Sequence, residues 1–174
     1  MTRLVIEPLP GYSPGVGRLV SMLTYVREGV LHAADGLTRD ELDHLHDPQS
    51  NSIGALLAHA AAVERWYQIL TFDEREPKPT DEAPLLAALD LGDPGRCELR
   101  GRDLRGYLED LSEARQRTLA ELARRDDGWL ERPLAAMPEM NAHWAWFHVA
   151  EDEISHRGQI HWLRKRLPGR ERRS

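Results

Sequence analysis

Cysteine is nearly absent from the sequence, since Cys97 is the only one among 174 residues. A single thiol excludes an internal disulfide framework and a cluster of thiolate metal ligands. Cys97 also has no predicted basic partner that would activate it as a nucleophile. Because low cysteine usage is typical of a reducing compartment, we expect a cytoplasmic protein.

Long apolar runs are also missing. No run approaches the roughly 20 apolar residues of a membrane span, and the N-terminal stretch is too short and too interrupted by proline for a signal peptide. We therefore expect no membrane partner. Apolar residues make up 41% and charged residues 30% of the chain, enough for one core with a solvated surface. The length predicts one domain, residues 1–174.

The chain lacks the general basic excess of a nucleic-acid binder, because its formal net charge is −6. Residues 164–174 are the exception, with six basic residues and one acid. Cations suit the carboxyl end of a helix. We interpret this segment as a solvated helix end followed by a basic tail, about 167–174, and expect no nucleic-acid partner.

Sustained alternation and internal repeats are absent, and helical periodicity dominates. The first long helix is predicted to begin at a Ser13 cap and to stop at Gly36. Its expected buried stripe consists of Val16, Leu19, Val20, Leu23, Val26, Val30 and Ala34. Thr38 and Glu41 have capping-box spacing, which predicts a short helix over about 39–46.

Three further long helices are predicted over about 52–70, from 103 to a stop at Gly128, and over 141–166. The last two are predicted to begin at Asp103 and Asn141 caps. A long connection, about 73–102, is expected to cross the core with one short helix at 85–89. Four long amphipathic helices with one long connection predict an all-α four-helix bundle.

A helical wheel of 100° per residue divides the histidines of the last helix. His148, Asp152 and His156 share an arc with Trp144, Ala145, Ser155, Gln159, Trp162 and Leu163, which should face the core. The opposite arc should face water and holds His143, Glu153, Arg157, His161 and Arg164. On the second helix, His59 lies on the stripe of Leu56, Val63, Trp66 and Leu70.

Three or four inward polar groups at one level of a bundle need partners, because burying them alone costs several kcal/mol. A divalent ion explains the set, since imidazole and carboxylate suit zinc, nickel, iron or manganese. Asp152 and His156 are spaced i, i+4, and His59 would be the third ligand from a facing helix. The alternative is an Asp–His hydrogen bond in a metal-free core.

The segments NSIGALLAHAAAVERW (51–66) and WAWFHVAEDEISHRGQIHWL (144–163) resemble the DinB-like (DinB/YfiT) superfamily. The segment GLTRDEL and the order of elements match as well. The resemblance implies an up-down-down-up four-helix bundle, often a homodimer, with a divalent metal held by three side chains. His59 and His156 match family histidines, whereas Asp152 stands where the family usually has the first histidine of the last helix.

Other residues of the matching segments have weaker assignments. His148 is interpreted as a fourth ligand, a partner of the Asp152 carboxylate, a proton shuttle or a core histidine. Gln159 is expected to hydrogen-bond a cofactor or substrate. Glu64 is expected in a surface salt bridge and Arg157 in a structural ion pair. The tryptophans Trp66, Trp144 and Trp162 are expected to fill the core or to line a pocket beside the metal, and Trp146 to lie at a dimer or loop contact.

Family members that the chain resembles include transferases and isomerases that use a small bacterial thiol such as mycothiol or bacillithiol. The resemblance therefore implies a metal-dependent thiol S-transferase or isomerase acting on a small molecule, with His148 as a candidate acid or base. A metal-assisted hydrolase is a variant in which water replaces the thiol. A non-catalytic, metal-binding, stress-associated protein and a metal-free structural bundle are the other hypotheses.

Overall fold

A computed structural model describes residues 5–83 and 85–169. Its long helices are α1 (Pro14–Ala34), α3 (Ile53–Thr71), α7 (Leu104–Leu122) and α9 (Ala142–Arg164). The described residues form no strand, apart from an isolated bridge between Pro133 and Asn141. Among them, none of the helices combines the length and apolar character that a membrane span requires.

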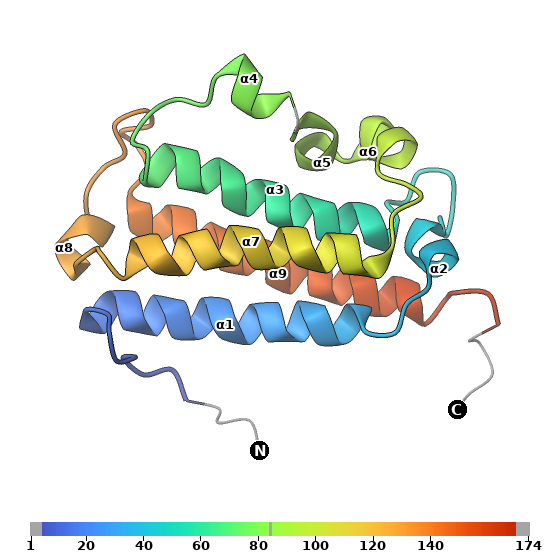
Figure 1. Ribbon diagram of the computed structural model, residues 1–174, viewed down its shortest axis with the longest axis horizontal. Helices are drawn as coiled ribbons and strands as arrows, with labels where there is room; N and C mark the ends of the chain where they lie inside the picture. Colours follow the sequence, from blue (N-terminus) through green and yellow to red (C-terminus); the bar gives the residue numbers. More distant parts are fainter. Residues whose placement is uncertain (1–4, 84, 170–174) are drawn as a thin grey trace.

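The four long helices form the predicted up-down-down-up bundle (Figure 1). Helices α1 and α9 run in one direction, and α3 and α7 run in the other. The parallel pair α3 and α7 needs a connection that returns along the whole bundle. This crossover contains α4 (Pro79–Glu82), α5 (Leu86–Asp90) and α6 (Gly92–Glu98), whereas the sequence predicted a single short helix there.

The short helix α2 (Arg39–Asp43) ends earlier than predicted, but its capping box between Thr38 and Glu41 is confirmed. Gly128 does not end the third long helix. It lies in a further short helix, α8 (Asp127–Leu130), because α7 already stops at Leu122.

Caps are predicted for three of the long helices, and one is confirmed, since Asn141 accepts a hydrogen bond from the backbone of α9. Ser52 also accepts one from the backbone of α3, where the sequence predicted only the start of a helix. Ser13 does not cap α1. Its hydroxyl donates to Asp127, and that carboxylate accepts from the first amides of α1 (2.8 Å from Gly15 N). Asp103 likewise makes no cap, because its carboxylate accepts from Arg39.

The predicted stripe of α1 is buried throughout. The predicted inward arc of α9 is wrong in part. Trp144 and Trp162 are 46% and 44% exposed, whereas Trp146 is fully buried. The helix is rotated so that its core face carries Trp146, Val149, Glu153 and Ile160, and the Asp152–His156 pair lies at the edge of this face. Trp66 is half-buried against the core, and His143 and His161 are exposed as expected.

A layer of buried charges separates two apolar clusters in the core. Each long helix contributes one member: Arg27, Glu64, Arg115 and Glu153. Arg27 contacts both carboxylates at 2.7 Å, and Arg115 contacts them at 2.8 and 2.6 Å. The surface salt bridge predicted for Glu64 and the solvent-facing position predicted for Glu153 are therefore wrong. A wheel assigns charged residues to water, and it cannot detect partners on other helices.

The electrostatics of this layer follow from its pairing. Burial opposes ionisation of Glu64, but the charges of Arg115 and Arg27 outweigh it and hold the pKa of the Glu64 carboxyl below its usual value. Thr118 donates a further hydrogen bond to this carboxylate at 2.6 Å. The two guanidinium groups also donate to the carbonyl oxygens of Leu111 and Leu23. The layer is thus fully paired, which removes the cost of isolated buried charge.

Arg157 packs differently from its prediction. Its guanidinium lies over the ring of Tyr25, 5.9 Å from the centroid, instead of pairing with an acid within the described part of the chain. The side chain also fills the space above Gly29, where an added Cβ would lie 2.6 Å from the guanidinium. Glycine at this point of α1 leaves room for the Arg157 side chain.

Candidate metal centre

The antiparallel neighbours α3 and α9 bring His59, Asp152 and His156 together. One ligand atom from each residue lies within 4.8 Å of the others. The Asp152 Oδ1 atom is 3.3 Å from His59 Nε2 and 3.1 Å from His156 Nε2. Asp152 and His156 reach this point from successive turns of α9, as their i, i+4 spacing predicts. The group could hold a metal ion.

The crossover fixes the orientation of His59. Its Nδ1 atom is 2.7 Å from the carbonyl oxygen of Ala88 in α5. A carbonyl only accepts, so Nδ1 carries the hydrogen and Nε2 faces Asp152. A neutral His59 would then point a lone pair at a carboxylate oxygen, which is repulsive unless a proton or a cation lies between them. Backbone carbonyls often orient metal-binding histidines in this way.

Two buried atoms of the group have no hydrogen-bond partner among the described residues, namely Asp152 Oδ2 and His156 Nδ1. Buried polar atoms are rarely left unpaired, because losing hydration without a partner costs about 1–3 kcal/mol. The donor set of two imidazoles and one carboxylate is a common one for divalent metals. The residues present therefore fit a metal ion.

The charges of the group are strongly coupled. Burial disfavours the carboxylate of Asp152, but hydrogen bonds from His156 and His59 outweigh burial and lower its pKa well below the usual range. Burial likewise opposes the imidazolium form of His59, yet the hydrogen bond and charge of Asp152 raise its pKa. Asp152 is consequently an ionised carboxylate that attracts positive charge into the site.

His148 lies one turn before Asp152, outside the group that could hold a metal. Its Nδ1 atom is 3.3 Å from a Glu151 carboxylate oxygen, and its ring stacks on Trp144. The ring also meets Tyr67 edge-on, with centroids 5.7 Å apart. Among its predicted roles, a direct contact with the Asp152 carboxylate and a core position are not observed, because His148 is half-exposed and pairs with Glu151.

Sequence reasoning missed Tyr67, which is buried beside the site. Burial, together with the negative charge of Asp152, raises the pKa of its hydroxyl to about 12, so Tyr67 stays protonated at neutral pH. Tyr67 lies eight residues after His59, which places both on one face of α3. This spacing is the sequence feature that could have identified Tyr67 as a neighbour of the site.

An apolar pocket of about 330 Å³ opens next to the site, on the side of His148. It is lined by Val63, Trp66, Tyr67, Leu86, Leu89, Asp90 and His148. A second pocket of about 560 Å³ lies on the side of Ser155 and Gln159, and it also contains Trp162. Trp66 and Trp162 therefore line pockets near the site, which is the alternative that the sequence left open for them.

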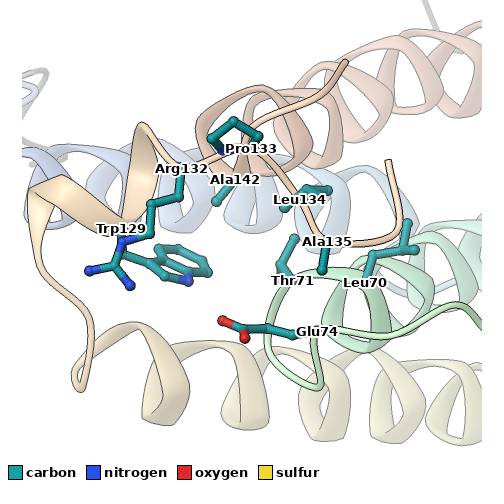
Figure 2. Close-up of a pocket in the computed structure, with 9 residues that line it drawn as sticks. All are labelled: Leu70, Thr71, Glu74, Trp129, Arg132, Pro133, Leu134, Ala135 and Ala142. Atoms are coloured by element: carbon teal, nitrogen blue, oxygen red, sulfur yellow. The ribbon is translucent and has the colours of Figure 1, made fainter. Parts of the chain in front are cut away.

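A third pocket of about 210 Å³ lies farther along the bundle, between the end of α3, α8 and the loop before α9. Figure 2 shows the carboxylate of Glu74 and the indole of Trp129 facing its open space. Of its residues, Leu70 is eleven positions from His59 and Ala142 is ten positions from Asp152, or roughly 15 Å along each helix. This pocket is separate from the His–Asp–His group.

The fold and the site together define a DinB-like four-helix bundle with a three-residue group that could hold a metal ion. A family model described as Mycothiol-S-transferase matches residues 18–169, and the chain therefore belongs to the mycothiol S-transferase family. Membership implies a thiol S-transferase enzyme with a small-molecule thiol substrate, which confirms the transferase predicted from the sequence. No curated protein matches the chain.

Proposed function

We propose that the protein is a metal-dependent mycothiol S-transferase in which His59, Asp152 and His156 hold a divalent ion: zinc, nickel, iron or manganese. One observation carries the proposal. Three donor residues from two helices meet at one point, and two of their buried atoms have no other partner. Three protein ligands leave coordination positions open, as is typical of catalytic rather than structural sites.

When bound, the ion supplies Lewis acidity that lowers the pKa of a thiol in the site. The chain's own residues prepare the site for this chemistry. Ala88 orients His59 through its carbonyl oxygen. The largely apolar pocket beside Tyr67 accommodates the electrophilic acceptor. The apolar and aromatic side chains that line it favour electrophilic acceptors with an apolar or aromatic skeleton.

His148 is proposed to move the proton. In the transfer, the thiol sulfur forms a bond to the electrophilic carbon while the bond from that carbon to the leaving group breaks. The thiol proton passes to His148, which then gives it to the leaving group. Two features support this role: His148 lines the acceptor pocket, and it lies one turn from Asp152 while remaining half-exposed to water.

Metal content and transfer activity test the assignment in a His156→Ala variant. We expect at least a tenfold loss of bound metal, with a parallel loss of mycothiol transfer to an apolar electrophile. His161→Ala is the matched control, because His161 is an exposed histidine on the same helix. Both properties should be unchanged in this control.

Equal metal content in His156→Ala and the unaltered protein would overturn the ligand assignment. Loss of metal without any change in transfer would instead indicate a metal that only stabilises the bundle. Hydrolysis of the electrophile without added thiol would favour the hydrolase alternative.

A homodimer is proposed as the assembled form. The support is a row of exposed apolar side chains along α9: Trp144, Phe147 and Ile154 are 46%, 52% and 48% exposed. Large apolar side chains gathered on one helix face often mark an interface.

A further inference from the structure

The pocket of about 560 Å³ combines an unusual set of neutral polar groups. It is formed by the segment before α3 and by the exposed side of α9. Its lining residues are Gln49, Ser50, Asn51, Ser155, Gly158, Gln159, Trp162 and Leu163, none of which carries a charge. Amides and hydroxyls without charge suit a ligand with many neutral hydroxyl groups.

Several of these polar groups are available for a ligand. Within the described part of the chain, the side chains of Ser155 and Gln159 make no hydrogen bond to protein. Asn51 accepts one hydrogen bond, from the Gly92 amide, through Oδ1 at 3.1 Å. Its side-chain amide hydrogens remain free to donate. The pocket thus offers donors and acceptors that no protein group occupies.

The indole of Trp162 supplies an apolar wall. Trp162 is 44% exposed, although it also contacts His46 edge-on. The Arg166 guanidinium covers one face of the ring, 3.8 Å from its centroid. Much of the Trp162 side chain remains exposed despite the contacts with Arg166 and His46. Saccharide and cyclitol rings have an apolar C–H face and hydroxyls at their rims, so they match an aromatic wall beside free amides.

The pocket lies along the same two helices as the candidate metal centre, displaced from it in one direction. On α9, Ser155 lies one turn and Gln159 two turns after Asp152, while His148 of the apolar pocket lies one turn before it. Asn51 lies just before the antiparallel α3, eight residues ahead of His59, while Val63 and Tyr67 follow His59 on the helix. Both helices therefore place the His–Asp–His group between the neutral polar pocket and the apolar pocket.

We propose that the neutral polar pocket binds the sugar and inositol rings of the thiol substrate, with Gln159 and Trp162 as the main contacts. This inference rests on the proposed function and deepens it. A thiol whose polyol lies here extends its cysteinyl sulfur towards the metal centre, and the acceptor enters from the apolar side. No residue that lines the pocket is cationic, and the neighbouring Arg166 guanidinium lies against the Trp162 ring, so the pocket favours an uncharged polyol over the carboxylates of a thiol such as glutathione.

Calorimetric titration with N-acetylglucosaminyl-inositol, an uncharged polyol without the thiol, tests the pocket by itself. We expect the unaltered protein to bind it and Gln159→Ala and Trp162→Leu to bind about tenfold more weakly. Gln116→Ala is the matched control, because Gln116 is an exposed glutamine on α7. Its affinity should equal that of the unaltered protein.

Steady-state transfer assays give a second readout. Both pocket variants should raise the KM for mycothiol about tenfold and leave kcat nearly unchanged, because the polyol contacts are distant from the reacting sulfur. Replacing mycothiol by glutathione should abolish turnover by the unaltered enzyme. Efficient use of glutathione would contradict the pocket's selectivity.

The outcomes separate the two proposals. Active mycothiol transfer with no polyol binding, or with equal polyol affinities in all variants, would overturn the inference alone. Polyol binding that weakens in the pocket variants, without any thiol transfer, would support the inference and overturn the proposed function.

Discussion

Four charged residues in the core, one from each long helix, determine how these helices align with one another. Arg27, Glu64, Arg115 and Glu153 pair across all four helices between two apolar clusters. A buried ion pair contributes little net stability, yet removing one partner leaves the others uncompensated. The charge layer therefore favours the one alignment of the helices in which every member is paired.

Glu64→Ala tests this pairing. The variant leaves two buried guanidinium groups with one carboxylate, so we expect the free energy of unfolding to fall by about 3–5 kcal/mol in urea denaturation. Glu113→Ala is the control, because Glu113 pairs with Arg65 at the exposed surface and should change stability by about 1 kcal/mol or less. Similar losses in both variants would contradict a special role for the buried layer.

The residues of the metal centre were easier to predict than those of the charge layer. Asp152 and His156 are local neighbours on one helix, and His59 has a polar side chain on an apolar stripe. Glu64 and Glu153 have no such local signal, because their partners are long-range. Tyr67 was missed because an aromatic residue on an apolar stripe has an ordinary core interpretation.

Helix ends show the same division between local and long-range causes. Ser52 and Asn141 follow local capping rules. The Asn141 cap was predicted, and Ser52 stands at the predicted start of its helix. Ser13 and Asp103 look equally suitable, but Asp127 and Arg39 bind them from distant parts of the chain. The three short crossover helices were mostly missed, since helices of this length depend on tertiary packing rather than on their own sequence.

Ser52→Ala tests the cap of the helix that carries His59. Ser52 is 2% exposed, and its hydroxyl accepts from the Ala55 amide at 3.1 Å. Loss of the cap should lower the free energy of unfolding by about 1 kcal/mol. Ser112→Ala, at an exposed interior position of α7, should cause little loss. Equal stability of Ser52→Ala and the unaltered protein would show that the cap is dispensable.

In the described part of the chain, exposed apolar side chains follow α9, and this surface is the proposed homodimer interface. The prediction of one domain over residues 1–174 stays a prediction at this scale, and the basic tail beyond residue 169 lies outside the described residues. Association in solution therefore has to be measured directly.

Phe147→Glu addresses the proposed interface, because a buried charge at its centre should convert dimers into monomers in light scattering. Phe147 is 52% exposed, so the substitution does not disturb the core. Ala120→Glu, at an exposed position of α7, should leave the mass unchanged. A monomeric unaltered protein would refute the homodimer, and a dimer that persists in Phe147→Glu would locate the interface elsewhere.

Because Ala88 hydrogen-bonds His59, the crossover orients a side chain of the candidate metal centre as well as joining α3 to α7. The backbone of α5 holds the His59 imidazole in its orientation, so the length of this connection is constrained by the candidate metal centre as well as by topology. In chimeras that exchange the crossover between related bundles, the orientation of the His59 imidazole would accordingly depend on the crossover that is introduced. Engineering of acceptor preference in this protein should keep residue 88 in place and vary its neighbours Leu86 and Leu89.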